Sequence, residues 1–584
     1  MSDDKIFNLQ TENGIGVVTI SVPGEPINTW TDGAIRSFLA LLDQLEAASD
    51  LKGAIFISGK PGSFHVGADL KMLDLMTDKA ETTRALDIFH DAFRRLSALR
   101  FPTVAAIEGH CLGGGLEFAL TCTARIAKDT KGTLLGLPEC TLGIFPGAGG
   151  TQRLPRLIGY TAIELVLKGT IMPAVRAFEL VIIDRLLPED RDLLTAAIGF
   201  VKEIAAGTYV LKRPHHDFLE VDQVTEMARR EVLKVSRGRE IPGPMLAIKS
   251  MRDGLKVSLD EGLELEKNNF VEAVLTNQAK GSIHTFFLKT MSDKPSSMIT
   301  KGFEARPIKK IAILGFGTMG RGIAINTLST SRIGVVVKDL DSALRPGREF
   351  VRKTLDGMAE KKRLKEPVDD LMSRLTEVSE YNDAFKDVDL VIEAVFEDIK
   401  VKEKVYRELS AVARDDTIIA TNTSSIPMHS MARFVTKPER FGGLHFFSPV
   451  WLMQLVEVIK GETTSRETVD NLLSFAAAIR KRPIVCKDNP GFVVNAMLFP
   501  YFQSAMEFLD AGNSIESVDK AFLDFGMPVG PVRLTDEVGI DVCYNVIRGR
   551  KLRQETLKNM VESGLYRPVE NRGGWRSKSA APVS

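Results

Sequence analysis

Strand-like runs alternate with longer polar segments in the second half of the chain. The runs are IAIL (311–314), VVVKD (335–339), DLVIEAV (389–395) and TIIATNTSS (417–425). Short runs rich in Val and Ile are typical of buried strands, and the segments between them are long enough for helices. The alternation of β and α units predicts an α/β fold with a parallel, doubly wound sheet.

Before these runs, apolar residues repeat with the spacing of a helix. Leucines recur every four positions at Leu255, Leu259 and Leu263, and the pair Phe270 and Val274 has the same spacing. This spacing predicts a helical stretch whose one apolar face packs against its own domain. The polar segment 291–307, which contains two prolines, then separates the two halves of the chain.

Length and composition narrow the class of protein. The 584 residues are too many for one core, and a size of roughly 150 residues per domain suggests about four units. Lys plus Arg and Asp plus Glu number 76 each, so the net charge is zero and nothing favours a nucleic-acid partner. Hydrophobic content of 44% and charged content of 26% are ordinary for a soluble globular protein.

Five cysteines and the absence of long apolar runs bear on the compartment. The cysteine count is odd and no CxxC pair occurs, so neither a disulfide framework nor a metal site is expected. The start MSDDKIFNLQ has no apolar signal core, and no run approaches the roughly 18 apolar residues of a membrane span. We expect a cytoplasmic protein of bacterial type, with a mature mitochondrial protein as the alternative.

The run GFGTMG (315–320) directly follows the strand IAIL. Gly315 permits a tight turn, Gly317 lets the backbone approach a pyrophosphate, and Gly320 lets the following helix pack close to the strand. Such a run alone is weak evidence, because a flexible glycine loop has the same composition. Asp339, at the end of the next strand, can accept a hydrogen bond from a ribose 2′-OH and would repel a 2′-phosphate. The combination predicts a site for NAD rather than NADP.

A candidate pair for oxidising an alcohol lies further on. His445 ends one strand-like run and Glu457 lies in the next, and a hairpin-like return through SPVWLMQ would bring them together. A carboxylate on one ring nitrogen orients a histidine base and stabilises the imidazolium that forms. A purely structural pair is the alternative. Ser424, after the strand IIATN, and Asn495, in NPGFVVN, are candidate substrate contacts.

These motifs together resemble the 3-hydroxyacyl-CoA dehydrogenase family: GxGxMG, KD, EAVFED with VKEK, NTSS, LHFFSPV, VEVIKG and NPGFVVN. The resemblance implies that His445 is the general base, paired with Glu457, and that Ser424 and Asn495 contact substrate. The position of Ser448 often carries Asn in this family. The residues implied to line the NAD site, besides the three glycines, are Met319, Asp339, Val395, Phe396, Glu397, Lys402, Ser424 and Ser448.

The first half carries three glycine-rich or acidic segments: SFHVGADLKML (63–73), IEGHCLGGGLEFAL (107–120) and LGLPECTLGIFPGAGGTQRLPR (135–156). Two backbone N–H groups that converge on a thioester oxygen would stabilise an enolate, and the candidates are those of Ala68 and Gly114. Glu117 and Glu139 are candidates for the acid and the base that adding water to a double bond requires.

Each of these features also has a simpler interpretation. The glycines 113–115 suit tight packing of a helix on a sheet, Glu117 alone suits a solvated helix position, and Asp69 is expected to be a helix N-cap. Together the three segments resemble the crotonase family with both glutamates present. Because members that only isomerise, hydrolyse or dehalogenate commonly lack one of them, the resemblance implies a hydratase, with a side isomerase activity as an option.

The order of the two halves resembles the multifunctional α-subunits of fatty-acid β-oxidation complexes. The resemblance implies acyl-CoA thioester substrates, NAD as cofactor and a thiolase β-subunit as partner. It implies five parts: a crotonase-like domain (1–190), its helical completion and linker (191–306), a Rossmann NAD-binding domain (307–488), an all-α dehydrogenase domain (489–566) and a tail (567–584).

The end of the chain departs from that family. A second helical repeat expected after residue 566 is missing, and the tail RPVENRGGWRSKSAAPVS reads as disordered. The main hypothesis is a bifunctional hydratase and dehydrogenase. One alternative is a hydratase or isomerase whose dehydrogenase half binds NAD but has impaired dehydrogenase activity. The other is a subunit that mainly recruits thiolase.

Overall fold

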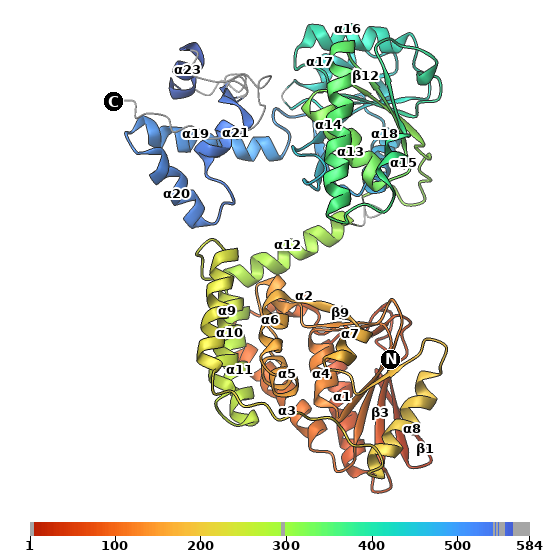
Figure 1. The fold of residues 1–584 in the computed structure, drawn as a ribbon, viewed down its shortest axis with the longest axis vertical. Helices are drawn as coiled ribbons and strands as arrows, with labels where there is room; N and C mark the ends of the chain where they lie inside the picture. The colour runs from red at the N-terminus through yellow and green to blue at the C-terminus, as the bar shows by residue number, and fades with distance from the viewer. Residues whose placement is uncertain are drawn as a thin grey trace. The chain divides into compact units, whose positions relative to one another are not determined.

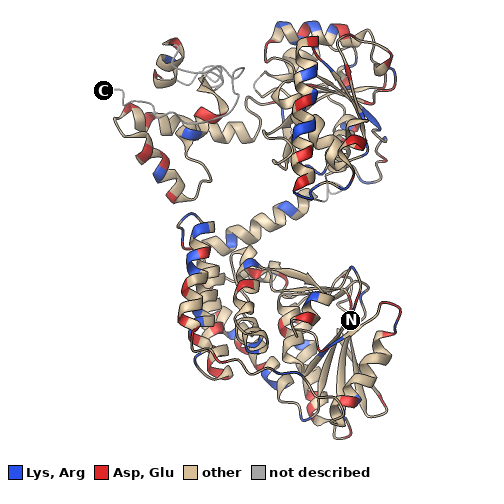
Figure 2. Ribbon diagram, viewed as in Figure 1, with Lys and Arg blue, Asp and Glu red and all other residues tan. Residues whose placement is uncertain are grey.

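The computed structural model describes residues 5–293, 298–424, 426–540, 543–544, 547 and 555–563. It divides into two compact units, Met1–Leu288 and Lys289–Ser584, each with its own sheets and core (Figure 1). Within the described residues no helix is long and apolar enough to cross a membrane. Acidic and basic residues are interspersed along the helices of both units (Figure 2).

The first unit is built on a six-stranded sheet in which only the β1–β2 pair is antiparallel. Ile55 and Val104 face α8 (Leu193–Ala205), whereas Phe56 and Ala105 belong to the cluster with α1 (Asp32–Ala47) and α3 (Lys79–Ser97). Both faces are therefore covered, as expected for parallel strands of nearly continuous apolar sequence. In spatial order the strands are β1 (Phe7–Glu12), β2 (Ile15–Ile20), β3 (Gly53–Ser58), β5 (Thr103–Ile107), β7 (Ala124–Lys128) and β10 (Arg185–Leu187).

A second, four-stranded sheet brings the glycine-rich segments together. Its members are β4 (Ser63–His65), β6 (His110–Leu112), β8 (Leu134–Gly136) and β9 (Ile171–Pro173). Because β4, β6 and β8 run parallel, their carboxyl ends meet at one edge. The loops that carry Ala68, Gly114 and Glu139 all leave from that edge.

Helices complete the first unit: α9 (Val221–Val235), α10 (Pro242–Gly254), α11 (Leu259–Val274) and most of α12 (Asn277–Asp293), which continues past Leu288. The expectation of one helical stretch from Leu255 onward is wrong, because α10 ends at Gly254 and α11 begins only at Leu259. Ser258 and Glu261 form a reciprocal capping box there, and this local signal overrides the four-residue spacing of the leucines. The later part of the prediction is confirmed, since Phe270 and Val274 are buried on α11.

The second unit contains the predicted doubly wound sheet. The strands from β13 to β16 are all parallel in the order β13-β12-β11-β14-β15-β16, then β17 pairs antiparallel with β16, and β18 pairs parallel with β17. The four predicted strands are confirmed: the first two agree within one residue at each end, and the other two are shorter than predicted. The strands are β11 (Lys310–Leu314), β12 (Gly334–Lys338), β13 (Leu375–Val378), β14 (Leu390–Glu393), β15 (Ile418–Thr421), β16 (Phe441–Phe446), β17 (Leu455–Lys460) and β18 (Arg482–Lys487).

Helices cover both faces of this sheet. One apolar cluster joins it to α13 (Thr318–Thr330), α14 (Asp341–Glu360) and α18 (Arg466–Ala478), and another joins it to α16 (Ile399–Ser410) and α17 (Met428–Ala432). A separate cluster built on Phe499, Phe502 and Met506 holds the last helices. These are α19 (Val494–Asp510), α20 (Ile515–Phe525), α21 (Pro531–Val538) and α23 (Glu555–Glu562). The predicted tail 567–584 lies outside the described residues.

Candidate active sites

The two N–H groups predicted to hold a thioester oxygen lie close together in the first unit. A Cβ placed on Gly114 would come within 3.6 Å of the nitrogen of Ala68, and a Cβ on Gly67 within 2.8 Å of the nitrogen of Gly114. Gly114 opens α4 (Gly114–Thr121), so its N–H is one of the free donors of a helix N-terminus. In the described part of the chain neither N–H donates to another group, and both remain available to an incoming oxygen.

The loop that carries Ala68 is fixed from both sides. Asp69 is the N-cap of α2 (Leu70–Leu75), with its carboxylate accepting from the N–H of Lys71 at 2.9 Å, as predicted. The buried His65 accepts from the N–H of Gly67 through Nδ1 at 3.2 Å and lies against Trp30. Burial lowers the pKa of His65 to about 3, so its ring is neutral and suited to accept.

Glu117 is a buried residue of α4 rather than the solvated position that its helix alone would allow. Its Oε1 accepts from the N–H groups of Ala148 at 2.7 Å and Gly150 at 2.8 Å. Burial raises the pKa of this carboxyl to about 7, although the two N–H groups act in the opposite direction. The carboxyl therefore titrates near neutrality, which suits a general base.

Glu139 begins the short helix η1 (Glu139–Leu142) and faces the same region. A Cβ on Gly113 would lie 2.9 Å from its Oε1, so a larger residue at position 113 would collide with the carboxyl. Its Oε2 is buried and has no hydrogen-bond partner among the described residues. Burial, and then the charge of Glu117, raise the pKa of Glu139 well above its usual range. Both effects favour the protonated form of this carboxyl.

A third buried carboxyl, Glu266 of α11, was not found from the sequence. It accepts from the N–H groups of Gly149 at 2.5 Å and Thr151 at 2.8 Å, next to the two that Glu117 holds. Burial raises its pKa to about 8, and the charge of Glu117 adds to that. The sequence did contain a clue to this residue: Glu266 lies on the apolar helical face between Leu263 and Phe270, where a solvated side chain is not expected.

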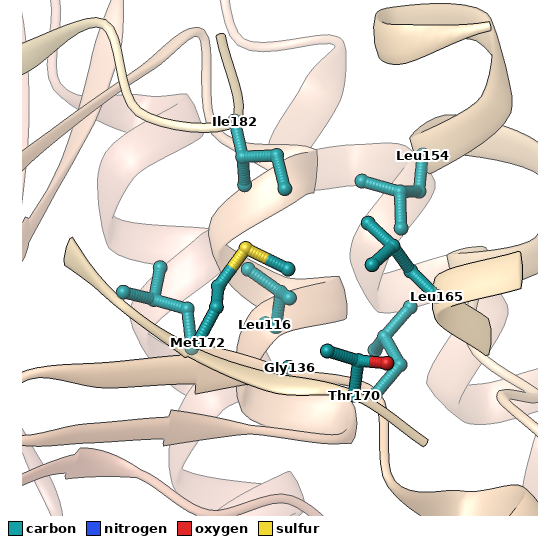
Figure 3. Close-up of a pocket in the computed structure, with 9 residues that line it drawn as sticks. Leu116, Gly136, Leu154, Leu165, Thr170, Met172 and Ile182 are labelled. Atoms are coloured by element: carbon teal, nitrogen blue, oxygen red, sulfur yellow. The ribbon is translucent and has the colours of Figure 1, made fainter. Parts of the chain in front are cut away.

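A small apolar pocket lies beside the segments that carry the two candidate catalytic glutamates (Figure 3). Leu116, next to Glu117, and Leu137, two residues before Glu139, both line it. Met172, Ile182 and the hydroxyl-bearing Thr170 line it as well. No titratable side chain is among its lining residues. The pocket is therefore part of the apolar packing around the site and holds no acid or base. The acid–base groups of the site are the carboxyl groups of Glu117 and Glu139.

The glycine turn of the second unit has the geometry of a dinucleotide site. Gly315 has φ 99°, and a Cβ on Gly320 would lie 1.9 Å from the carbonyl oxygen of Gly315, so the helix α13 packs too closely for any side chain. Gly317, by contrast, faces open space. Asp339 accepts from the N–H of Phe316 at 2.6 Å and thereby fixes the turn. These residues fit NAD, because the turn leaves room for a pyrophosphate at the N-terminus of α13.

Charged residues flank this turn at the ends of β14 and β15. Lys402 is buried, with its Nζ 2.7 Å from Glu393 and 3.0 Å from Glu397. Glu397 also accepts from Thr423 Oγ1 at 2.5 Å and from the N–H of Ser424 at 2.9 Å. Lys402 is thus held by two carboxylates, one of which, Glu397, also accepts from Thr423 and Ser424.

The remaining predicted NAD residues surround this network in the second unit. Val395 donates its N–H to Glu393 at 2.9 Å, and the Phe396 side chain is exposed beside it. Met319 packs on α13 against the sheet, and Ser448 lies exposed after β16. A crevice at the carboxyl ends of β11 and β14 is the topological switch point of such a sheet, where ligands bind.

His445 and Glu457 meet as predicted. They are direct register partners of the antiparallel pair β16–β17, and His445 Nδ1 lies 2.7 Å from Glu457 Oε2. The other carboxylate oxygen accepts from the N–H groups of Val493 and Val494, both at 2.9 Å. Burial alone would raise the pKa of Glu457, but the bonds from His445 and from these N–H groups outweigh it and lower the pKa.

That arrangement leaves one histidine nitrogen for substrate. With Nδ1 on Glu457, Nε2 is the ring atom available to take a proton. The imidazole is buried and contacts the rings of Phe447 and Phe492. Asn495, at the start of α19, follows the two N–H groups that Glu457 holds, which keeps it near His445. Within the described residues no cluster of His, Cys, Asp and Glu is arranged to hold a metal ion.

Comparison with known proteins matches three segments of the chain to family models. Residues 10–218 match the family model for enoyl-CoA hydratase/isomerase. Residues 310–489 match the NAD binding domain of 3-hydroxyacyl-CoA dehydrogenase, and residues 491–576 match its C-terminal domain. The matches confirm the predicted fold class, with a crotonase-like domain, a Rossmann-type domain and a helical dehydrogenase domain.

Curated relatives extend over nearly the whole chain. A fatty acid oxidation complex subunit alpha from Shewanella frigidimarina is 39% identical over 93% of the chain and 77% of its own length. The same subunit from Shewanella sp. strain MR-4 is 38% identical over 92% of the chain and 77% of its length. Among solved structures, an (S)-3-hydroxybutyryl-CoA dehydrogenase from Ralstonia eutropha is 34% identical, covers 46% of the chain and 98% of its own, and has a TM-score of 0.43.

Proposed function

The chain belongs to the family of fatty acid oxidation complex α-subunits, and on this premise we propose that its two active sites act on the same carbon in sequence. It is an enoyl-CoA hydratase joined to an NAD-dependent 3-hydroxyacyl-CoA dehydrogenase. The first site adds water to a trans-2-enoyl-CoA at C3, and the second oxidises that 3-hydroxyl to the 3-ketoacyl-CoA. The observation that carries the proposal is that complete sets of acid–base groups lie buried in both units.

The hydration roles follow from how each carboxyl is held. Glu117, whose Oε1 is fixed by two N–H groups, takes a proton from water as the hydroxide adds to C3. The charge that develops on the thioester oxygen is stabilised by the N–H groups of Ala68 and Gly114. Glu139, protonated and with a free Oε2, then delivers its proton to C2. At the end of the step water has been added, Glu117 is protonated and Glu139 is ionised.

A pH profile tests this assignment. Because the pKa of Glu117 is raised to about 7 and its charged form is the active one, the kcat of hydration is expected to rise about tenfold per pH unit below neutrality. It should level off above that value while Glu139 stays protonated. The profile is measured from initial rates of enoyl-CoA consumption. A kcat that stays flat through the acid range would exclude Glu117 as the base.

The oxidation roles follow from the hydrogen bonds of His445. Its Nε2 takes the proton of the 3-hydroxyl, and Glu457 on Nδ1 stabilises the imidazolium that forms. When bound, NAD supplies the acceptor for the hydride that leaves C3. Ser424 and Asn495 are proposed to orient the hydroxyl and the thioester carbonyl. Gly315, Gly317, Gly320, Met319 and Asp339 hold the dinucleotide, together with Val395, Phe396, Glu397, Lys402 and Ser448.

The substitution Asp339→Asn tests the cofactor preference. The amide keeps an oxygen for the N–H of Phe316 but loses the charge that binds the ribose and repels a 2′-phosphate. The ratio of kcat/KM with NAD to that with NADP is expected to fall at least about tenfold, since a hydrogen bond to a charged group contributes roughly 1.5–3 kcal/mol. Asp341→Asn, an exposed carboxylate two residues away, is the control and should leave the ratio unchanged.

The bifunctional hypothesis is tested by a coupled assay. Crotonyl-CoA with NAD should yield NADH without any added enzyme, since the first site makes the substrate of the second. The alternative, a crippled dehydrogenase, predicts hydration without NADH and no turnover of 3-hydroxybutyryl-CoA. The intact His445–Glu457 pair favours the active form. A scaffold would give neither reaction.

We further propose that the chain assembles with a thiolase-type subunit, which would cleave the 3-ketoacyl-CoA product. The support is that its relatives are named as subunits of a complex. Cys111, Cys122, Cys140 and Cys486 are buried thiols outside any disulfide, which favours a reducing compartment such as the cytoplasm. Co-purification of a thiolase with the intact chain tests the partner, and the absence of thiolase activity from the purified complex would contradict it.

A further inference from the structure

The segment 146–151 carries four successive N–H groups that are divided between two buried carboxyl groups. Those of Ala148 and Gly150 donate to Glu117, at 2.7 and 2.8 Å. Those of Gly149 and Thr151 donate to Glu266, at 2.5 and 2.8 Å, and the hydroxyl of Thr151 donates to Glu266 as well. Because the N–H groups alternate along one segment, a displacement of either glutamate would shift the backbone that donates to the other.

The same segment begins α5 (Gly150–Ile158), and this explains why it needs remote acceptors. Its N-cap is Gly149, with φ 108° and no side chain that could accept from the first turn. Buried N–H groups without an acceptor are costly, so the two glutamates act in place of a local cap. One comes from α4, which contains the candidate base, and the other from α11, more than a hundred residues further along the chain.

One face of α11 fits the segment closely. A Cβ on Gly147 would lie 2.4 Å from the ring of Phe270, and a Cβ on Gly149 would lie 3.2 Å from Leu263. Glu266 lies between these two residues on the same helical face. His90 of α3 also contacts the segment, with its Nε2 2.7 Å from the carbonyl oxygen of Gly147. Contacts from both α3 and α11 therefore hold the segment and leave it little room to shift.

We propose that Glu266 is a positioning residue for hydration: by holding the N–H groups of Gly149 and Thr151, it fixes the segment whose other two N–H groups aim the carboxylate of Glu117. This inference rests on the proposed hydratase function. Glu266 touches neither substrate nor the reacting atoms in this scheme and acts only through the backbone. The other titratable or charged groups facing Glu117 and the segment are Glu139, Arg153 and His90.

Glu266→Gln is the first test. An amide can accept from only one of the two N–H groups and turns a donor toward the other, so the segment must relax. The kcat of crotonyl-CoA hydration is expected to fall about 10- to 100-fold, with KM changed less than about threefold, because misplacing a reacting group costs about that much. Oxidation of 3-hydroxybutyryl-CoA by the same preparation should stay at the wild-type rate and serves as an internal control for folding.

A second readout separates positioning from a loss of folded protein. Weaker N–H bonds to Glu117 would raise its pKa, since those bonds act to lower it. In a variant that keeps the Glu266 carboxyl, such as Thr151→Val, the acid limb of the hydration profile should therefore move to higher pH. A smaller folded fraction would scale the profile without moving it. Glu264→Gln, an exposed residue half a turn away on α11, is the matched control and should behave as wild type.

Thr151→Val provides a milder variant in case Glu266→Gln does not fold. It removes the hydroxyl, which donates to Glu266 and accepts from Gln152 Nε2, and keeps the N–H, so a smaller loss of kcat, about 3- to 10-fold, and a shift of the acid limb to higher pH are expected. Wild-type kcat and an unmoved acid limb in the folded variants would overturn the role of Glu266 alone. A wild-type chain without hydration would instead overturn the proposed function, and this role with it.

Discussion

Glu139→Gln is expected to abolish hydration while the same chain continues to oxidise 3-hydroxyacyl-CoA. The carboxyl is the group that delivers a proton to C2, and an amide of the same shape has none to give. The loss of kcat should be at least about 10³-fold, within the range that positioned acids and bases supply. The measurement is the initial rate of crotonyl-CoA hydration, beside the rate of NADH formation from 3-hydroxybutyryl-CoA.

The oxidation rate of that variant serves as its control for folding, because Glu139 and the dehydrogenase residues belong to different compact units. Glu164→Gln, an exposed carboxyl on α6 (Thr161–Lys168), provides a matched change that should leave both rates unaltered. If Glu139→Gln retained a tenth or so of wild-type hydration, the proton for C2 would have to come from another group.

His445→Gln is expected to have the converse effect. Without an imidazole the 3-hydroxyl has no base within hydrogen-bond reach, and oxidation should fall about 10³- to 10⁴-fold while hydration is unchanged. Glu457→Gln should cost less, because the histidine remains but loses the partner that stabilises its charged form. The rates are measured as NADH formation from 3-hydroxybutyryl-CoA at saturating NAD.

NAD binding should survive His445→Gln, since the residues that hold the dinucleotide are elsewhere on the sheet, and the quenching of protein fluorescence by NADH checks this. His429→Gln, a largely exposed histidine on α17, is the matched control. A variant at position 445 that binds NADH normally and still oxidises its substrate at near the wild-type rate would exclude His445 as the base.

Local sequence patterns were sufficient for most of the second unit. The strand IAIL, the turn from Gly315 to Gly320 and Asp339 follow one another within thirty residues or so, and such short-range order is what dinucleotide motifs record. The pairing of His445 with Glu457 was also accessible, because two adjacent strands joined by a short return have little freedom in which residues face each other.

The sequence could not show how remote segments combine. Glu266 reaches the loop after Gly147 only because α11 packs on it, and the N–H groups that Glu457 accepts from come from the start of α19. Lys402 was implied to line the NAD site, but its burial between the carboxylates of Glu393 and Glu397 became visible only in the structure. Among the leucines that recur every four residues from Leu255, the capping box at Ser258 decided that α11 begins at Leu259.

The sequence by itself therefore determined the order of the two enzymes, the dinucleotide turn and the identity of Glu117, Glu139, His445 and Glu457 as candidates. Periodicity, turn chemistry and residue type are local properties, and they can be read along the chain. The tertiary structure alone decided which carboxyl is held by N–H groups, which remains free to keep a proton, and which third carboxyl supports them. Those differences depend on burial and on partners from distant segments, because the pKa and orientation of a side chain are set by what surrounds it.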